Sequence, residues 1–120
     1  MSKPVGAYRP IVRAGEWLVV SGQIGLKDGT MVGGGLRDEL NQAIDNLEGL
    51  LASEAATLGD VVKTTVYLRH MGDYGILNEI WLARFGDALP ARAAVAVSEL
   101  PVHALVEIEA MAYVGTGPGA

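Results

Sequence analysis

The sequence predicts one α+β domain with the element order ββαβαββ, in which a single mixed sheet carries two helices on one face. Five β-like segments of alternating or β-branched residues are separated by two segments with three- and four-residue apolar spacing. A chain of 120 residues is also too short to give two folded units a useful core each. We expect this domain to span residues 1–120, with an ordered core over about residues 5–114 and a flexible tail at 115–120.

The N-terminal quarter predicts a β-hairpin. Residues 17–24 are rich in aromatic and β-branched side chains, and a shorter apolar run with a glycine-containing turn precedes them at residues 10–16. The pair Asp28-Gly29 marks a turn, and the glycines at 33–35 lead into the next element. These glycines lack the Gly-Lys-Ser/Thr and GxGxxG patterns of phosphate-binding loops.

Residues 36–59 predict an amphipathic helix that ends near Gly59, since apolar residues from Leu36 to Leu51 recur at three- and four-residue spacing. Residues 60–70 then alternate and predict a strand. Val62, Thr64, Val66 and Leu68 are expected on one side of this strand, and Val61, Lys63, Thr65 and Tyr67 on the other.

Asp73 is the expected N-cap of a second helix that runs to Phe85, with Pro90 beyond its end. Two strands follow at residues 91–98 and 104–114, joined by a turn at 99–102. Right-handed β-α-β crossovers then place both helices on the same face of the sheet. The opposite face would carry Trp17, Val19 and Met111 together with carboxylates. Since that face is too apolar to remain in water, we expect it to pack against copies of itself.

Charge and composition exclude several function classes. The net charge is −5 and no run of Lys or Arg occurs, so nucleic acid is not an expected partner. Cysteine is absent, which excludes thiolate zinc sites and Cys nucleophiles, and the histidines are not clustered as in zinc deaminases. No apolar stretch reaches the length of a membrane span or a signal peptide, so the expected location is cytoplasmic, without a membrane partner.

Arg92 is the principal candidate for function. Val95 and Val97 suit the helix-facing side of their strand, which would place Arg92 on the other side, with Glu107 and Glu109. A guanidinium cannot lose its charge, so on an interface face it needs a glutamate or an anionic ligand. The residues alone leave both interpretations open: a structural Arg–Glu pair, or a carboxylate-binding site with a glutamate as acid or base.

Several motifs stand in an order and spacing that resembles the RidA, or YjgF, family from Gly6 to Val114. They are Ser21-Gly-Gln-Ile24, Asp60-Val-Val-Lys-Thr-Thr-Val-Tyr67, Asn78, Pro90-Ala-Arg92, Leu100-Pro101 and Val106-Glu-Ile-Glu-Ala110. The resemblance implies a chorismate-mutase-like fold, a homotrimer with sites between subunits, and hydrolytic deamination of small enamine/imine acids of the 2-aminoacrylate/2-iminopropionate type to a 2-keto acid and ammonia. It also implies that neither a metal nor an organic cofactor is needed.

The same resemblance assigns roles to individual residues. Arg92 is expected to bind the substrate carboxylate and Glu107 to activate the attacking water. Tyr8 would cover the site from the neighbouring subunit, with Ser21 and Asn78 as polar lining.

This chain departs from the family pattern at three positions. Ala7 replaces the proline of Gly-Pro-Tyr, Pro10 stands where glutamine is common, and Ala94 replaces a frequent cysteine and leaves only a backbone carbonyl to hold the water. A non-catalytic module that binds small carboxylates is therefore the alternative function, and an RNA-directed activity is the weakest one. Trp17, Trp81 and Phe85 are interpreted as core or interface residues.

Overall fold

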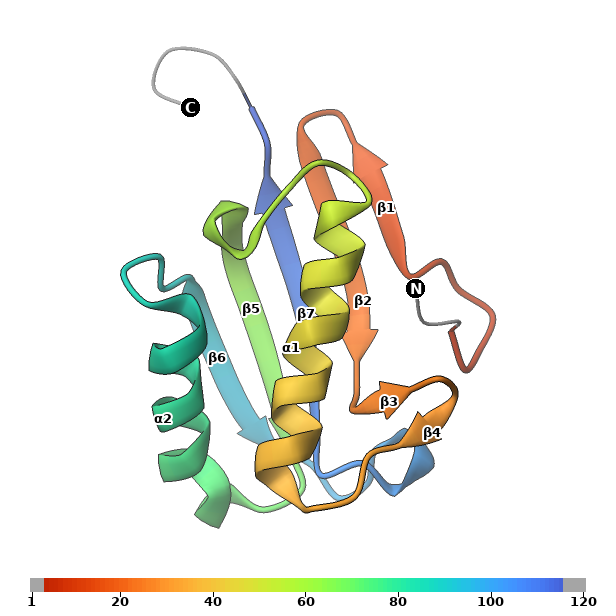
Figure 1. Ribbon diagram of the computed structural model, residues 1–120, viewed down its shortest axis with the longest axis vertical. Helices are drawn as coiled ribbons and strands as arrows, with labels where there is room; N and C mark the ends of the chain where they lie inside the picture. The colour runs from red at the N-terminus through yellow and green to blue at the C-terminus, as the bar shows by residue number, and fades with distance from the viewer. Residues whose placement is uncertain (1–3, 116–120) are drawn as a thin grey trace.

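A five-stranded mixed sheet with strand order β1-β2-β7-β5-β6 carries two helices on one face in this computed structural model, which describes residues 4–115 (Figure 1). The strands are β1 (Ile11–Ala14), β2 (Trp17–Gln23), β5 (Val61–Leu68), β6 (Ala91–Ala96) and β7 (Val106–Tyr113). The pair β5–β6 is parallel, and the other neighbouring pairs are antiparallel. The predicted α+β class and ββαβαββ order are confirmed, while most of the predicted tail, residues 116–120, lies outside the described residues.

A second, two-stranded sheet was not predicted. It consists of β3 (Leu26–Lys27) and β4 (Thr30–Met31). The predicted turn joins these strands, and Asp28 and Gly29 both have positive φ, 53° and 80°. Two-residue turns with left-handed backbone match the twist of such a hairpin, which explains the Asp-Gly pair.

The helices are α1 (Leu36–Ala52) and α2 (Tyr74–Phe85). The prediction that α1 ends near Gly59 was wrong: a turn with Ala55 in the left-handed region (φ 58°) and the 3-10 helix η1 (Leu58–Asp60) follow it. Asp73 occupies the N-cap position of α2, although its side chain makes no capping hydrogen bond. Within residues 4–115, neither helix has the length and apolarity to span a membrane.

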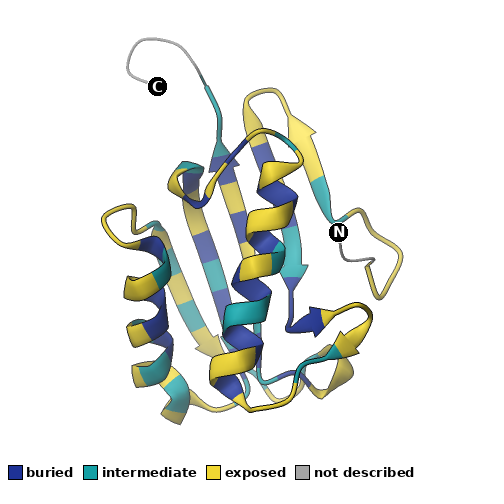
Figure 2. Cartoon of the chain, viewed as in Figure 1, coloured by how far each residue is buried: buried dark blue, intermediate teal, exposed yellow. Residues whose placement is uncertain are grey.

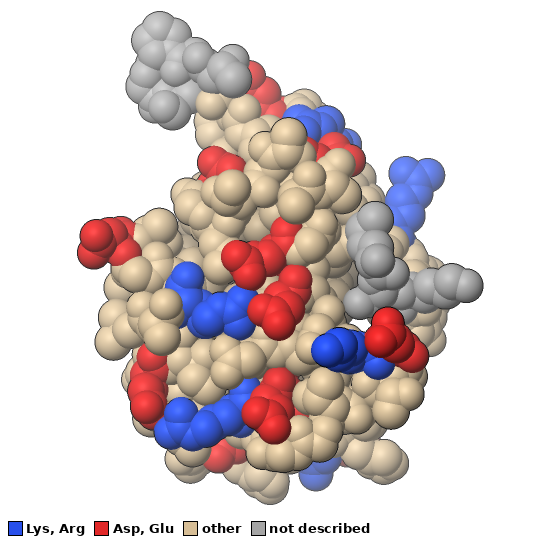
Figure 3. All heavy atoms as spheres, viewed as in Figure 1, with Lys and Arg blue, Asp and Glu red and all other residues tan. Residues whose placement is uncertain are grey.

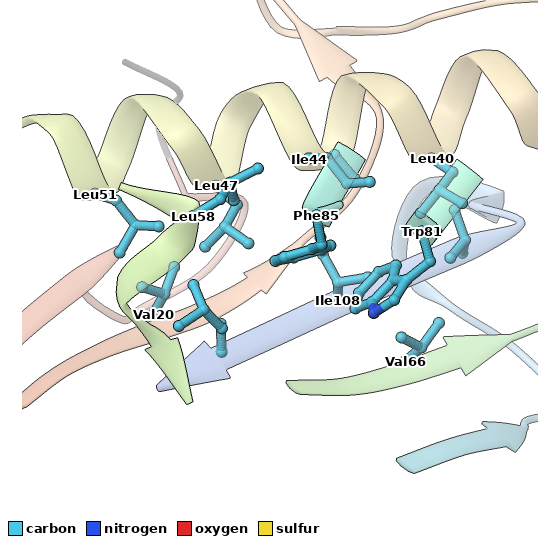
Figure 4. Packing of buried hydrophobic residues seen from close by; sticks show 14 of the residues in the cluster. Val20, Leu40, Ile44, Leu47, Leu51, Leu58, Val66, Trp81, Phe85 and Ile108 are labelled. Carbon is cyan, nitrogen blue, oxygen red and sulfur yellow. The ribbon is translucent and has the colours of Figure 1, made fainter. Parts of the chain in front are cut away.

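The core lies between the helices and the sheet. Leu40, Ile44 and Leu51 of α1 are completely buried, and Trp81 and Phe85 of α2 pack together with ring centroids 4.7 Å apart (Figures 2 and 4). Because each buried side chain of this size contributes about 1.5–3 kcal/mol through the hydrophobic effect, the apolar stripe of α1 fixes that helix on the sheet.

Arg84 joins the two helices at their solvent side. Its Nη1 donates to the carbonyl of Asn41, and its Nη2 donates to Asp45 at 2.6 Å and to Glu48 at 2.8 Å. A single cation of α2 thus pairs with two carboxylates of α1 and links the two helices.

The predicted faces are correct for β7 and partly wrong for β5. Val106, Ile108 and Ala110 of β7 are buried under the helices, as predicted. At the start of β5, however, Val61 is buried and Val62 is 44% exposed, the reverse of the prediction. The pairing with β7 shifts between Val61 and Lys63, and this irregularity inverts the alternation locally.

The sheet face opposite the helices is apolar and open in the single chain. Val12, Val19 and Met111 lie on neighbouring strands, and their exposed fractions are 40%, 42% and 40%. The ring of Trp17 lies edge-on to that of Tyr113 at 5.0 Å. We call this surface the outer face.

Candidate active site

Arg92 lies on the helix-covered side of the sheet, and the prediction that it shares a face with Glu107 and Glu109 was wrong. Arg92 pairs with Thr64 of β5, which is completely buried under the helices. Glu107 instead pairs with Tyr67, three residues further along β5 and therefore on the opposite face.

The physical reason is the small size of the β6 side chains. Ala94 packs against the helix-side core, whereas Val95 is 43% exposed on the outer face. Alanines leave room for the large Trp81 and Phe85 of α2, so the β-branched residue is excluded from the core despite its hydrophobicity.

Three residues of α2 hold the guanidinium of Arg92. Nη2 donates a hydrogen bond of 2.7 Å to Oδ1 of Asn78 and one of 3.2 Å to the hydroxyl of Tyr74. The guanidinium carbon lies 5.4 Å from the ring centroids of both Tyr74 and Trp81, within range of cation–π attraction. We call Arg92 and these three residues the guanidinium site.

No carboxylate of the described residues forms an ion pair with Arg92. Among residues 4–115, the ion pairs join Arg13 to Glu54, Arg37 to Glu79, and Arg84 to Asp45 and Glu48. The partners of Arg92 are neutral oxygens and aromatic rings. On the helix-covered face, several Lys and Arg side chains stand beside Asp and Glu (Figure 3). A held but unneutralised guanidinium is suited to bind an anion.

A cavity of about 350 Å³ opens on the other side of the sheet. The residues that line it are Pro4, Val5, Tyr8, Pro10, Ser21, Gly22, Gln23, Ile24, Leu26, Asn46, Pro101, Glu107 and Glu109. Three predicted site residues, Tyr8, Ser21 and Glu107, therefore lie together, and we call this space the carboxylate cavity. Among the described residues, no cluster of three His, Asp or Glu side chains is suited to hold a metal ion.

Burial and a neighbouring charge change the acidity of Glu107. Desolvation raises the pKa of this half-buried carboxyl above its ordinary value, and the negative charge of Glu109 raises it further. Glu109 accepts a hydrogen bond of 2.5 Å from the hydroxyl of Tyr67, and this bond is the main cause of a raised Tyr67 pKa. A carboxyl with a raised pKa is a stronger proton acceptor than an ordinary glutamate, which suits it to take a proton from water and return it to a substrate.

Ser21 holds the segment that carries Tyr8. Its hydroxyl donates to the carbonyl of Arg9 at 2.6 Å, and its backbone N–H donates to the carbonyl of Pro10 at 2.9 Å. The hydroxyl of Tyr8 accepts a bond of 3.3 Å from the N–H of Val5. Ser21 thus lines the carboxylate cavity, and its hydroxyl proton is used to fix the N-terminal segment.

The matching family model, described as endoribonuclease L-PSP, covers residues 1–114. The chain belongs to the RidA (YjgF) family.

Relatives and solved structures agree with this membership. A RutC family protein of Pyrococcus horikoshii is 42% identical over 92% of this chain and 90% of its own. A mouse 2-iminobutanoate/2-iminopropanoate deaminase is 42% identical over 92% of this chain and 84% of its own. The crystal structure of RidA from the Antarctic bacterium Psychrobacter sp. PAMC 21119 superposes with a TM-score of 0.89 at 35% identity, over 93% and 92% of the two chains.

Within this RidA-type fold, the candidate residues divide into two groups. Arg92 and Asn78 meet in the guanidinium site, with Ala94 on the same strand, while Tyr8, Ser21 and Glu107 meet in the carboxylate cavity. Sequence reasoning missed Tyr74 and assigned Trp81 only to core or interface. The signal that could have found both is their four- and three-residue spacing from Asn78, which places all three on one side of a helix.

Proposed function

We propose that this protein hydrolyses the C=N bond of small 2-imino acids and releases a 2-keto acid and ammonia. The mouse relative and others at 37–42% identity bear the name 2-iminobutanoate/2-iminopropanoate deaminase. The observation that carries the proposal is Arg92: its guanidinium is fixed by neutral partners and pairs with no carboxylate of the described chain. A small anionic substrate supplies the missing charge through a bidentate contact.

The complete site requires a second subunit. Arg92 and Glu107 lie on opposite faces of one sheet, so a single chain does not present both to one small molecule. The apolar outer face gives a reason for copies to associate, because burial of Val19, Met111 and Trp17 removes them from water. In the homotrimer that we propose, Arg92 of one subunit faces the carboxylate cavity of the next.

The chemical step then follows from the two groups. Arg92 holds the substrate carboxylate and thereby fixes the imine carbon beside Glu107. The ionised Glu107 takes a proton from water as the water oxygen attacks the imine carbon, and the resulting carboxyl returns the proton to nitrogen. The product of this addition is a tetrahedral carbinolamine. Its hydroxyl proton then passes through Glu107 to the nitrogen as the C=O bond forms and the C–N bond breaks, so that ammonia leaves and the keto acid remains. Because an imine is already electrophilic, this step needs proton transfer and positioning, without a metal or an organic cofactor.

The test supplies 2-aminoacrylate generated in situ and measures the release of ammonia and pyruvate. We expect the protein to accelerate release over buffer, and Arg92→Ala to reduce the rate to the buffer level while retaining the fold by circular dichroism. Glu79→Gln is the matched control, since Glu79 lies on the same helix but pairs with Arg37 at the surface. Release no faster than buffer from the unmodified protein would overturn the proposal.

The same test distinguishes the alternative of a binding module without turnover. Such a protein would gain thermal stability with pyruvate, which binds only the folded state, yet would release no ammonia. Salt-sensitive binding of RNA without deamination would instead indicate an RNA-directed activity.

A further inference from the structure

The arrangement of donors around Arg92 identifies a third group that contacts the substrate carboxylate. This step rests on the proposed function, because it assumes that the ligand of Arg92 is a carboxylate. It starts from the α2 positions 74, 78 and 81, which all contact the guanidinium from one side of the helix.

Nη2 has two protons to donate and two acceptors among the described residues. One of these bonds goes to Oδ1 of Asn78 and the other to the hydroxyl of Tyr74. A carboxylate can form two hydrogen bonds with a guanidinium either side-on, through Nε and Nη2, or end-on, through Nη1 and Nη2. Both of these bidentate arrangements need one proton of Nη2. A bidentate ligand must therefore take the place of one of the two acceptors.

Tyr74 is the acceptor that yields. Its bond to Nη2 is 3.2 Å long, whereas that of Asn78 is 2.7 Å, and Tyr74 is 42% exposed while Asn78 is partly buried. The longer and more exposed bond is the weaker one. When a carboxylate oxygen takes its place, the tyrosine hydroxyl remains beside that oxygen.

A phenol has a proton of its own to donate. In the hydrogen bond to Nη2 the oxygen of Tyr74 acts as acceptor, and no bond donated by its O–H is found among residues 4–115. Oδ1 of Asn78, the atom that is bonded to Arg92, cannot donate a hydrogen bond to the ligand, because an amide oxygen only accepts. Tyr74 is thus the group at this site that can exchange an accepting role toward Arg92 for a donating role toward the ligand.

We propose that Tyr74 is a further substrate-binding residue, whose hydroxyl donates a hydrogen bond to the same carboxylate that Arg92 binds. The carboxylate is then bound by two hydrogen bonds from the guanidinium of Arg92 and one from the hydroxyl of Tyr74. Asn78 and the ring of Trp81 keep the guanidinium in place. An ester or amide in place of the carboxylate lacks the charge that strengthens both contacts.

The experiment measures the affinity for pyruvate, the product expected from 2-iminopropionate, by isothermal titration calorimetry. Tyr74→Phe keeps the ring that faces the guanidinium and removes only the hydroxyl. Since a hydrogen bond to a charged group is lost, we expect affinity for pyruvate to fall about tenfold or more. The KM for the imino acid should rise by a similar factor with kcat almost unchanged, because the bond is made equally in the ground and transition states.

Two controls separate this inference from the proposed function. Methyl pyruvate, which lacks the charge, should bind weakly and equally to the unmodified protein and to Tyr74→Phe, and Glu79→Gln should bind pyruvate like the unmodified protein. Unchanged or tighter pyruvate binding by Tyr74→Phe would overturn the role of Tyr74 and leave the deaminase proposal standing. If the unmodified protein neither binds pyruvate nor deaminates 2-aminoacrylate, both proposals fail.

Discussion

At the scale of single residues, Glu107 has room in the carboxylate cavity because residue 22 has no side chain. A Cβ built on Gly22 would lie 2.7 Å from Cδ of Glu107, closer than carbon atoms can approach. Gly22 lies where the pairing of β2 with β7 shifts register, between Val20 and Gln23. The bulge and the missing side chain together let the carboxyl lie against β2.

Gly22→Ala should therefore displace the carboxyl of Glu107. We expect the deaminase kcat to fall at least tenfold, because a small misplacement of a proton-transfer group is costly. The free energy of unfolding should fall by about 1 kcal/mol or less, because the carboxyl ends a flexible side chain that can move aside. Urea unfolding and steady-state kinetics measure the two effects.

A double-mutant cycle identifies the cause of that loss. In a Glu107→Ala background the added methyl group meets no carboxyl, so Gly22→Ala should cost much less stability there. An equal cost in both backgrounds would mean that Gly22 is needed for the backbone of β2 and not for Glu107.

The raised pKa of Glu107 has a consequence for stability. A carboxyl with a raised pKa binds its proton more tightly in the folded state, so its contribution to stability falls as pH rises from the ordinary glutamate value, 4.5, through the folded pKa. Glu107→Gln removes this ionisation. The variant should gain stability relative to the unmodified protein between pH 4 and pH 7, as measured by thermal unfolding at both pH values. A difference that is independent of pH would contradict the assignment.

At the scale of elements, the link between β6 and β7 contains backbone strain. In the 3-10 helix η3 (Pro101–His103), Val102 has φ 57° and ψ 29°, and His103 also has positive φ, 55°. A β-branched residue in the left-handed region is disfavoured, and Val102 is 49% exposed, so little burial offsets the strain.

Val102→Asn should relieve that strain, since asparagine tolerates left-handed backbone. We expect a stabilisation of about 1 kcal/mol, seen as a rise of a few degrees in Tm by differential scanning calorimetry. Val62→Asn is a matched control, because Val62 is similarly exposed but lies in extended β5, where asparagine brings no such gain. A lower Tm for Val102→Asn would show that the valine has a role that its backbone does not explain.

At the scale of the whole molecule, the outer face decides whether the two halves of the site meet. A charge in the middle of this face should prevent subunits from packing there, because an unpaired buried charge is strongly unfavourable. We expect Met111→Asp to yield a folded monomer without deaminase activity, while the unmodified protein sediments as a trimer in analytical ultracentrifugation. Lys27→Asp, on the exposed hairpin β3–β4, should leave the assembly intact. An active monomer would contradict the intersubunit site.

Much of the fold could be predicted because its elements carry strong periodic patterns. The apolar spacing of α1 and the alternation of β7 reflect burial against one partner layer, and such patterns are visible in one chain. The sequence also held the motifs that identify the family and the two residues, Arg92 and Glu107, on which the proposed chemistry depends.

What the sequence alone did not determine is the face on which Arg92 lies. In β6 the side chains beside it are mostly alanines, which suit either face, and only the pairing of Arg92 with Thr64 under α2 settles the choice. The reversal of Val61 and Val62 likewise depends on a pairing shift with β7. The hydrophobic pattern of a sequence indicates which residues are buried. Strand register and the space available for packing depend instead on contacts between two elements. Only the tertiary structure therefore places Arg92 against Tyr74, Asn78 and Trp81.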